Sequence, residues 1–299
     1  MNQQNNEPLA SIGIFAYNGK KFIREAIESV LNQNYKNLEL VISDDFSQDG
    51  TEEICREFEK NDSRVKYFRQ AKNIGGYLNA NFVLQKSTGK YFAWLAHDDC
   101  LESEFIEKLV TYLESHPQCI LASGDVAFMD ENGSSLQIEY LTKLREEINW
   151  PARMREFFTY PLSRSFLSIY GLMRLEPVKK IFPGVPYPKK GTKGTEMLML
   201  DRFATVGEIV ALPQILRRQR THDKSMYNSE FNKLKQKNFL YRKFILLKNI
   251  WLIRLDQLKV LFGSNISASQ KIGIFLTVYF LYVKNYFLRI IKFPKKLFK

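Results

Sequence analysis

The sequence predicts an α/β protein in which a mostly parallel central sheet is flanked by helices and followed by a C-terminal α-helical appendage. Apolar runs of strand length alternate with amphipathic runs of helix length between residues 9 and 129. Strands that alternate with helices in this way build a parallel sheet with right-handed crossovers. After residue 230 the pattern changes to long stretches rich in Leu, Ile, Phe and Lys, which predicts the appendage.

The spacing of apolar residues gives the elements of the first half. Residues 9–17 (LASIGIFAY) and 38–42 (LELVI) are typical of buried strands, whereas residues 20–33 carry apolar side chains at helical spacing. Further strands are expected at residues 65–68, 91–96 and 120–129, and further helices at residues 51–59, 73–84 and 105–115. The segment at residues 73–84 is expected to contain a glycine-led loop before its helix.

The second half is less regular. Residues 132–200 are rich in aromatics and prolines, a composition that suits a lid or a wall for a second substrate. A helix is expected at residues 195–206, followed by two short strands at 208–212 and 214–218 around Pro213. No repeat or low-complexity segment interrupts the chain.

Composition narrows the class of protein. The net charge of +12 comes from residues 231–299, which hold 15 Lys or Arg and one acid, whereas residues 1–230 hold 29 basic and 31 acidic groups. This asymmetry indicates an appendage with an anionic partner of its own. Three scattered cysteines indicate a reducing compartment and argue against a zinc site. The N-terminus does not resemble a secretory signal, and the longest apolar stretch, residues 272–283, is about half of what a spanning helix needs.

Asp98 and Asp99 follow the apolar run at residues 91–96 after a single residue, His97. The carboxyl ends of strands are where α/β sheets bind ligands, and two adjacent carboxylates repel each other unless a cation lies beside them. Mg²⁺ or Mn²⁺ suits such oxygen ligands. The alternative is a strand followed by a helix cap, in which Asp99 caps and Glu102 completes a capping box.

Further ligand-type residues follow other strands of the predicted sheet. Tyr17 and Asn18 follow the first strand, Asp44 and Asp45 follow the second, and a glycine-led loop begins at Asn73. An aromatic ring, carboxylates and an amide-rich loop at one sheet edge indicate a nucleotide site with a metal. A Rossmann site is disfavoured because no GxGxxG follows the first strand, and a P-loop is absent as well.

Four ordered motifs resemble the opening of family 2 glycosyltransferases with the GT-A fold. They are residues 12–18 (IGIFAYN), 26–33 (AIESVLNQ), 40–51 (LVISDDFSQDGT), and Asn81 together with 89–99 (GKYFAWLAHDD). The resemblance is strong over about the first 130 residues and looser to about residue 226. It implies a GT-A catalytic domain at residues 1–230, with a nucleotide-binding half at about 1–130 and an acceptor half at about 131–230. Residues 231–299 then form a basic amphipathic helical region.

The resemblance also implies roles for individual residues. Phe15 and Tyr17 would line the pocket for the base, and Asp45 would contact base or ribose. Asp98 and Asp99 fill the DxD-type position, where Asp99 would ligate the metal and Asp98 would touch ribose or share the metal. The usual first aspartate of that motif is Ala96 here. The residues expected to bind the donor are Phe15, Tyr17, Asn18, Asp45, Asn73, Gly75, Gly76, Asn81, Asp98 and His222.

Two later segments complete the resemblance. Residues 193–201 (KGTEMLMLD) resemble the family's acidic base motif, so Glu196 is expected to be the general base; the alternative is an ordinary glutamate in a first helical turn. Residues 217–222 (RRQRTH) resemble the family's RxH ending, which implies contact of His222 with diphosphate or metal. A solvated basic strand edge is the alternative for Arg217 and Arg218.

The function that follows is an inverting, metal-dependent transfer of a sugar from a nucleotide-diphosphate-sugar to a hydroxyl acceptor. A UDP-sugar is favoured over dTDP- or GDP-sugars, and Mg²⁺ or Mn²⁺ is the expected cofactor. The acceptor is expected to be a saccharide of capsule or O-antigen assembly. The basic charge of residues 231–299 favours an acceptor that is carried on a lipid. A catalytically silent, donor-binding partner of a membrane-associated assembly complex is the alternative.

The appendage predicts the location of the protein. Basic amphipathic helices with aromatic residues adsorb to anionic bilayers, so we expect a cytoplasmic protein held peripherally at the inner face of the membrane. The alternative is that these helices pack on the catalytic domain. Nucleic acid is disfavoured as a partner because the aromatics lie among Leu and Ile rather than forming exposed stacking platforms.

Overall fold

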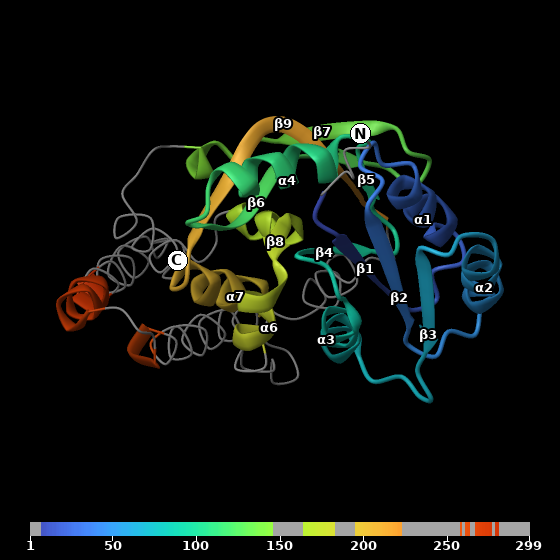
Figure 1. The fold of residues 1–299 in the computed structure, drawn as a ribbon, viewed down its shortest axis with the longest axis horizontal. Coiled ribbons are helices and arrows are strands. Elements are labelled where there is room, and N and C mark those ends of the chain that lie inside the picture. Colours follow the sequence, from blue (N-terminus) through green and yellow to red (C-terminus); the bar gives the residue numbers. More distant parts are fainter. Residues whose placement is uncertain are drawn as a thin grey trace, which may run out of the picture.

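A computed structural model describes residues 7–145, 164–182, 195–222, 258, 261–263, 267–276 and 279–280. Within them a nine-stranded sheet has the order β3-β2-β1-β4-β8-β6-β9-β5, with β7 paired to β6 (Figure 1). The strands are β1 Ala10–Ala16, β2 Leu38–Asp44, β3 Val65–Arg69, β4 Tyr91–Ala96, β5 Cys100–Leu101, β6 Cys119–Met129, β7 Ser135–Glu139, β8 Leu172–Arg174 and β9 Glu208–Arg220.

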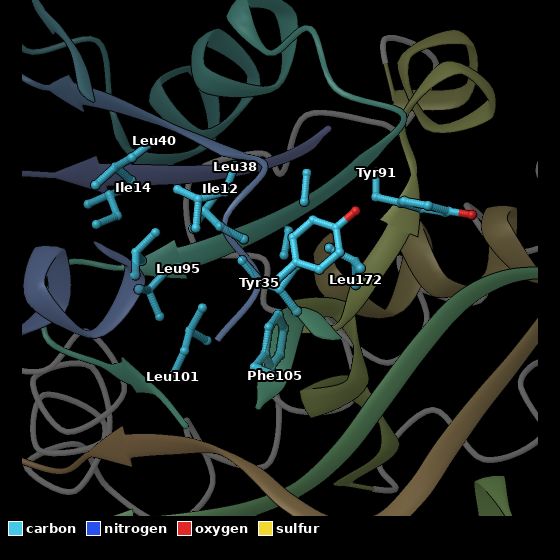
Figure 2. Packing of buried hydrophobic residues seen from close by; sticks show 14 of the residues in the cluster. Ile12, Ile14, Tyr35, Leu38, Leu40, Tyr91, Leu95, Leu101, Phe105 and Leu172 are labelled. Atoms are coloured by element: carbon cyan, nitrogen blue, oxygen red, sulfur yellow. The ribbon is translucent and has the colours of Figure 1, made fainter. Parts of the chain in front are cut away.

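The helices cover both faces of this sheet. They are α1 Ile23–Leu31, α2 Thr51–Asn61, α3 Gly76–Lys86, α4 Phe105–Ser115, α6 Leu175–Ile181 and α7 Thr195–Ala204, with 3-10 turns η1 Thr142–Leu144 and η2 Arg164–Tyr170. Buried residues of α1, α2 and α4 join one apolar cluster with β1 and β2, part of which is shown in Figure 2. Buried residues of α3, α6 and α7 join the cluster on the other face. The predicted mostly parallel α/β fold is therefore confirmed.

The parallel half matches the sequence prediction because each strand there is followed by its own helix. β1 pairs in parallel with both β2 and β4, and β2 pairs in parallel with β3. Three strands of the other half, β5, β7 and β8, were not predicted. β8 is inserted antiparallel between β4 and β6, and a Cβ on the preceding Gly171 would lie 2.3 Å from the Ala122 carbonyl oxygen. Only glycine fits such a close approach of two backbones.

β9 differs from the prediction of two short strands. It runs continuously through Pro213, and its register with β6 shifts there, so that Gly124 pairs with Leu212 and Asp125 pairs with Ile215. Proline has no N–H to donate to a ladder, and a bulge is the position where a sheet tolerates it. The strand therefore survives the proline and carries its last residues to the site described below.

Only parts of the predicted appendage fall within the described residues. Residues 268–276 are helical and begin with a capping box, in which Gln270 N–H donates to Ser267 Oγ (3.3 Å) and Ser267 N–H donates to Gln270 Oε1 (3.1 Å). Leu261 and Ile274 are buried in the cluster of α3, α6 and α7. No helix among the described residues is long and apolar enough to cross a bilayer. The proposed boundary at residue 230 stays a prediction.

Candidate functional site

The carboxyl ends of β1, β2 and β4 meet at one edge of the sheet. Phe15 pairs with Ser43 on one side and with Ala96 on the other. Tyr17, Asp45 and Asp98 each lie two residues beyond one of these paired positions. The structure therefore brings together the three strand ends from which the sequence predicted a site.

Tyr17 and Asn18 form the first part of this edge. The Tyr17 side chain is 49% exposed, whereas Phe15 is partly buried against the apolar cluster of α3, α6 and α7. Asn18 has a positive φ of 50°, donates its N–H to Ser47 Oγ (2.8 Å) and accepts the Gln48 N–H at Oδ1 (3.0 Å). Asn18 thus fixes the turn after β1 against the turn after β2 and leaves the Tyr17 ring open to a ligand.

Asp45 holds the glycine-led loop. Its buried carboxylate accepts the N–H groups of Ile74 (2.6 Å) and Gly75 (2.9 Å), while Asn73 Nδ2 donates to the Asp45 carbonyl (3.3 Å). Gly75 has a φ of +89°, a backbone conformation that residues other than glycine rarely adopt. A Cβ at Gly76 would meet nothing within 4 Å. The loop is therefore shaped by Gly75, while Gly76 leaves space at the start of α3.

Sequence reasoning missed Asn79, which contacts the strand ends more directly than the predicted Asn81. The buried Asn79 donates from Nδ2 to the carbonyl oxygens of Ser43 (2.9 Å) and Ala16 (3.3 Å), so it ties the ends of β2 and β1 to α3. Asn81 accepts from Gln85 on the same helix (3.3 Å). The available signal was a polar residue four positions before Val83 on the buried face of a predicted helix.

Asp98 and His222 form the centre of the site. Asp98 Oδ2 lies 2.9 Å from His222 Nε2, and the two side chains are 16% and 11% exposed. These side chains come from the end of β4 and from the segment after β9. The two are therefore close enough to share one ligand and open enough for it to reach them.

Asp99 points into the protein instead. It is buried, accepts from Arg217 Nη1 at Oδ2 (2.7 Å) and accepts the Arg220 N–H at Oδ1 (2.9 Å). Burial raises the pKa of the Asp99 carboxyl, while the Arg217 charge opposes this rise. Both oxygens are thus engaged by protein groups, a geometry that does not support the predicted role of Asp99 as first metal ligand.

The alternative reading of Asp99 as a helix cap is wrong. α4 begins at Phe105 with Glu104 in the N-cap position and with no side-chain cap bond. Glu102, expected to complete the capping box, instead forms an ion pair with Arg218 on the surface. The solvated-edge interpretation thus fits Arg218, but the side chain of Arg217 is only 4% exposed.

The remaining predicted residue, Glu196, lies in the first turn of α7. Its backbone places it near the helix N-terminus, where a carboxylate is stabilised as an anion. Its side chain falls outside the described atoms, so its role as general base stays a prediction.

The residues present fit a divalent cation held jointly by protein and substrate. Within the described part of the chain no group of three or more His, Cys, Asp or Glu is gathered around a metal position. Mg²⁺ is commonly bound by one or two carboxylates together with substrate phosphates. Asp98 and His222 supply an oxygen and a nitrogen at one place, which suits such a shared site.

Solved structures with a similar fold define the class. A crystal structure of S. aureus TarS in complex with UDP-GlcNAc matches with a TM-score of 0.63 at 15% identity, covering 90% of this chain and 71% of that one. The mannosyltransferase PcManGT of Pyrobaculum calidifontis, in complex with GDP-Man and Mn²⁺, matches with a TM-score of 0.55 at 14% identity, covering 92% of this chain and 81% of that one. The fold is therefore that of the GT-A transferases, as the sequence predicted.

The family follows from the sequence comparison. The model described as "Glycosyl transferase family 2" matches residues 11–182, more than half of the 299 residues, so the chain belongs to this family and the predicted resemblance is confirmed.

Relatives at the sequence level agree. An uncharacterized glycosyltransferase of Rickettsia typhi is 28% identical over 82% of this chain and 74% of its own length. The putative teichuronic acid biosynthesis glycosyltransferase TuaG of Bacillus subtilis is 30% identical over 44% of this chain and 52% of its own. The chain spans between 34% and 74% of the length of the first curated relatives it matches.

Proposed function

We propose that this protein transfers a sugar from a nucleotide-diphosphate-sugar to a hydroxyl group of a saccharide acceptor. One observation carries the proposal: Tyr17, the Asp45-held loop and the Asp98–His222 pair lie at one edge of the sheet. Family membership and the ligands named for TarS and PcManGT, UDP-GlcNAc and GDP-Man, support a donor of this class.

In this proposal the base of the donor stacks on Tyr17 and Phe15, and the ribose lies beside Asp45 and the loop of Asn73, Gly75 and Gly76. The half-exposed Tyr17 ring supplies an apolar surface with a polar tip. Because the loop's N–H groups already occupy the Asp45 carboxylate, Asp45 acts by shaping the loop around the donor. This assignment differs from direct contact of Asp45 with the base.

Asp98 and His222 would hold the divalent cation together with the donor's diphosphate. Such a cation stabilises the negative charge that develops on the departing diphosphate. Asp99 has a supporting role here, because its carboxylate fixes Arg217 and the backbone of Arg220 behind the pair. Ala96 replaces the aspartate that the family motif usually carries, so metal binding depends on few protein ligands.

The chemical step is a single inverting displacement. Glu196 accepts the proton of the acceptor hydroxyl as its oxygen attacks the anomeric carbon, and the bond from that carbon to the diphosphate breaks. A base acts in this way only within hydrogen-bond reach of the hydroxyl. The N-terminal position of Glu196 on α7 favours the ionised form that this role requires.

The C-terminal region supports an acceptor on a membrane. The described residues Phe262, Ile272, Leu276, Tyr279 and Phe280 are between 45% and 65% exposed, although Leu261 and Ile274 of the same region are buried in the core. With 15 basic residues against one acid in residues 231–299, this surface suits an anionic bilayer. We therefore propose peripheral attachment at the cytoplasmic face and a lipid-linked acceptor in cell-surface polymer assembly. The name of TuaG, which refers to teichuronic acid biosynthesis, supports this class of product.

The test is a thermal-shift panel of UDP, GDP and dTDP with Mn²⁺ and with EDTA, because a ligand of the folded state raises its apparent stability. The proposal expects one nucleotide to raise Tm, and to raise it further with Mn²⁺. The matching nucleotide-sugar is then incubated with the protein and release of the nucleotide is followed. The absence of a shift with all three nucleotides would contradict the proposal.

A catalytically silent donor-binding partner is the second candidate, and Ala96 at the usual aspartate position is the observation that favours it. The two candidates differ in slow donor hydrolysis with Mn²⁺. The silent partner predicts binding without hydrolysis, whereas the transferase predicts hydrolysis that disappears in Glu196→Gln or Asp98→Asn.

A further inference from the structure

Arg220, the last residue of β9, lies directly behind the Asp98–His222 pair. Its side chain is only 2% exposed. Sequence resemblance assigned this stretch to contact with the diphosphate, but a buried guanidinium is not placed for that task. The buried Arg220 guanidinium, two residues before His222, therefore has another role.

The guanidinium donors are used almost completely inside the protein. Nε donates to the Asp98 carbonyl (3.0 Å), and Nη1 donates to the carbonyls of Asp130 (3.2 Å) and Glu131 (3.0 Å). Nη2 forms an ion pair with Glu25. An arginine side chain has five N–H donors, so four of them are accounted for by protein acceptors.

These acceptors belong to separate segments of the chain. Asp98 follows β4, residues 130 and 131 follow β6, Glu25 belongs to α1, and Arg220 itself ends β9. The Arg220 N–H also donates to Asp99 (2.9 Å). The Arg220 guanidinium thus fixes the backbone of Asp98. Because Arg220 ends β9, it also fixes the segment after β9 that carries His222.

A second contact leads from Arg220 to His222 itself. The guanidinium carbon lies 4.7 Å from the centre of the Phe22 ring, and the ring centres of Phe22 and His222 are 5.3 Å apart. A cation over an aromatic face is attracted by the ring, and an edge or tilted pair of rings packs favourably. Phe22 therefore contacts both the buried cation and the imidazole and limits the positions that the imidazole can take.

We infer that Arg220 is a positioning residue that sets the separation of Asp98 and His222, acting through the Asp98 carbonyl and the Phe22 ring. The inference rests on the proposed function, because the geometry it fixes is the one that would hold a divalent cation beside a diphosphate. Groups that orient metal ligands from behind commonly change metal affinity ten- to a hundredfold when they are replaced.

Arginine is needed for this role because of its shape. A lysine in its place keeps the charge, but its three donors leave from one nitrogen and do not reach acceptors on several sides. Arg220→Lys therefore removes the planar set of donors while keeping the positive charge. Arg218→Lys is the matched control, since Arg218 lies on the same strand with a half-exposed side chain paired to Glu102.

The experiment measures Mn²⁺ binding by electron paramagnetic resonance, with the nucleoside diphosphate that gives the largest thermal shift in the panel above. Arg220→Lys is expected to weaken Mn²⁺ binding at least about tenfold. Nucleotide affinity measured with EDTA is expected to stay within about twofold of wild type, because a positioning residue for the metal ligands does not touch the base. Arg218→Lys is expected to change neither value.

Phe22→Leu keeps Arg220 and removes only the ring that contacts both Arg220 and His222. It therefore tests the inference even if Arg220→Lys does not fold. It is expected to weaken Mn²⁺ binding by a smaller factor and to leave nucleotide binding in EDTA unchanged. Unchanged Mn²⁺ affinity in folded Arg220→Lys, or in Phe22→Leu, would overturn the inference, as would an equal loss of Mn²⁺ and metal-free nucleotide affinity. A wild-type protein that binds no nucleotide would overturn the proposed function as well, so the two failures are distinguishable.

Discussion

At the scale of single residues, two neighbouring aspartates have different surroundings and so different expected roles. Asp98 meets His222 at the edge of the site, whereas Asp99 is buried against Arg217. Removing one member of a buried ion pair leaves an uncompensated charge, which costs about 3–5 kcal/mol. Asp99→Asn is therefore expected to lower the free energy of unfolding by roughly that amount, and Asp98→Asn is expected to change it little.

The measurement is urea unfolding of both variants, paired with the Mn²⁺-dependent part of the nucleotide thermal shift. Asp98→Asn should lose the Mn²⁺-dependent part while keeping its stability. If Asp99→Asn is stable and loses only metal-dependent binding, Asp99 is a metal ligand, and the supporting role inferred from its two protein partners is wrong.

Glu196 allows a second prediction at the same scale. Glu196→Gln keeps the size of the side chain and removes its basicity, so donor binding should persist while turnover falls by about 10²–10⁴, the range for loss of a general base. Glu176→Gln is the control, because Glu176 is an exposed acid in the first turn of α6. Isothermal titration with donor and a turnover assay separate the two effects. Loss of donor binding in Glu196→Gln would instead assign Glu196 to the donor pocket.

At the scale of elements, Glu39 on β2 joins three neighbours at the end of the sheet opposite the site. Its carboxylate accepts from Ser11 of β1 (2.6 Å), from Lys66 of β3 (2.6 Å) and from the Thr88 N–H before β4 (2.6 Å). Burial alone would raise the pKa of Glu39, but these donors together hold it below its ordinary value. The ionised carboxylate therefore stabilises the register of four adjacent strands.

This contribution has a defined pH dependence. Because the folded pKa is lowered, the contribution is present above the unfolded pKa of about 4.3 and is lost as the pH falls through the lower folded value. Glu39→Gln should lower the free energy of unfolding at pH 7 by about 2 kcal/mol, the scale of hydrogen bonds to a charged group. The difference from wild type should shrink below about pH 4 in urea titrations. A difference that stays constant down to pH 3 would show that folding does not lower the pKa of Glu39.

The elements also show which parts of the fold the sequence could predict. β1, β2, β3 and β4 were predicted because each is an apolar run followed by its own amphipathic helix, a local pattern. β5 and β8 contain two and three residues, too few for any periodicity, and they exist because neighbouring strands pair with them. β9 was predicted in two pieces because a proline normally ends a strand, and only the register shift of β6 shows why this one does not.

At the scale of the whole molecule, the same distinction separates the two halves of the site. The residues at the strand ends were predictable, because parallel strands bring their carboxyl ends to one edge whatever the rest of the chain does. Arg220 was not predictable as a positioning residue, since its ion pair with Glu25 spans 195 residues of sequence. Which of Asp98 and Asp99 faces the candidate site could not be predicted either, because this depends on where β9 ends. Sequence motifs thus predicted the candidate site, and tertiary contacts decide which side chains face it.

The attachment of the whole molecule to a membrane gives the last prediction. Deleting residues 231–299 would remove the buried Leu261 and Ile274 as well, so loss of vesicle binding in that variant would not separate attachment from unfolding. Tyr279→Ser with Phe280→Ser removes two rings that are 54% and 65% exposed and leaves the core intact. Leu136→Ser on β7, 57% exposed, is the control for loss of an exposed apolar side chain elsewhere.

The double variant should bind vesicles containing anionic phosphatidylglycerol about tenfold more weakly, as partial burial of two aromatic side chains implies. Wild type should bind neutral phosphatidylcholine vesicles weakly and should leave anionic ones at high salt, because the basic residues contribute through screened electrostatics. Equal sedimentation of the double variant, the control and the wild type would show that these rings do not contact the bilayer, and the proposed peripheral location would then lose its structural support.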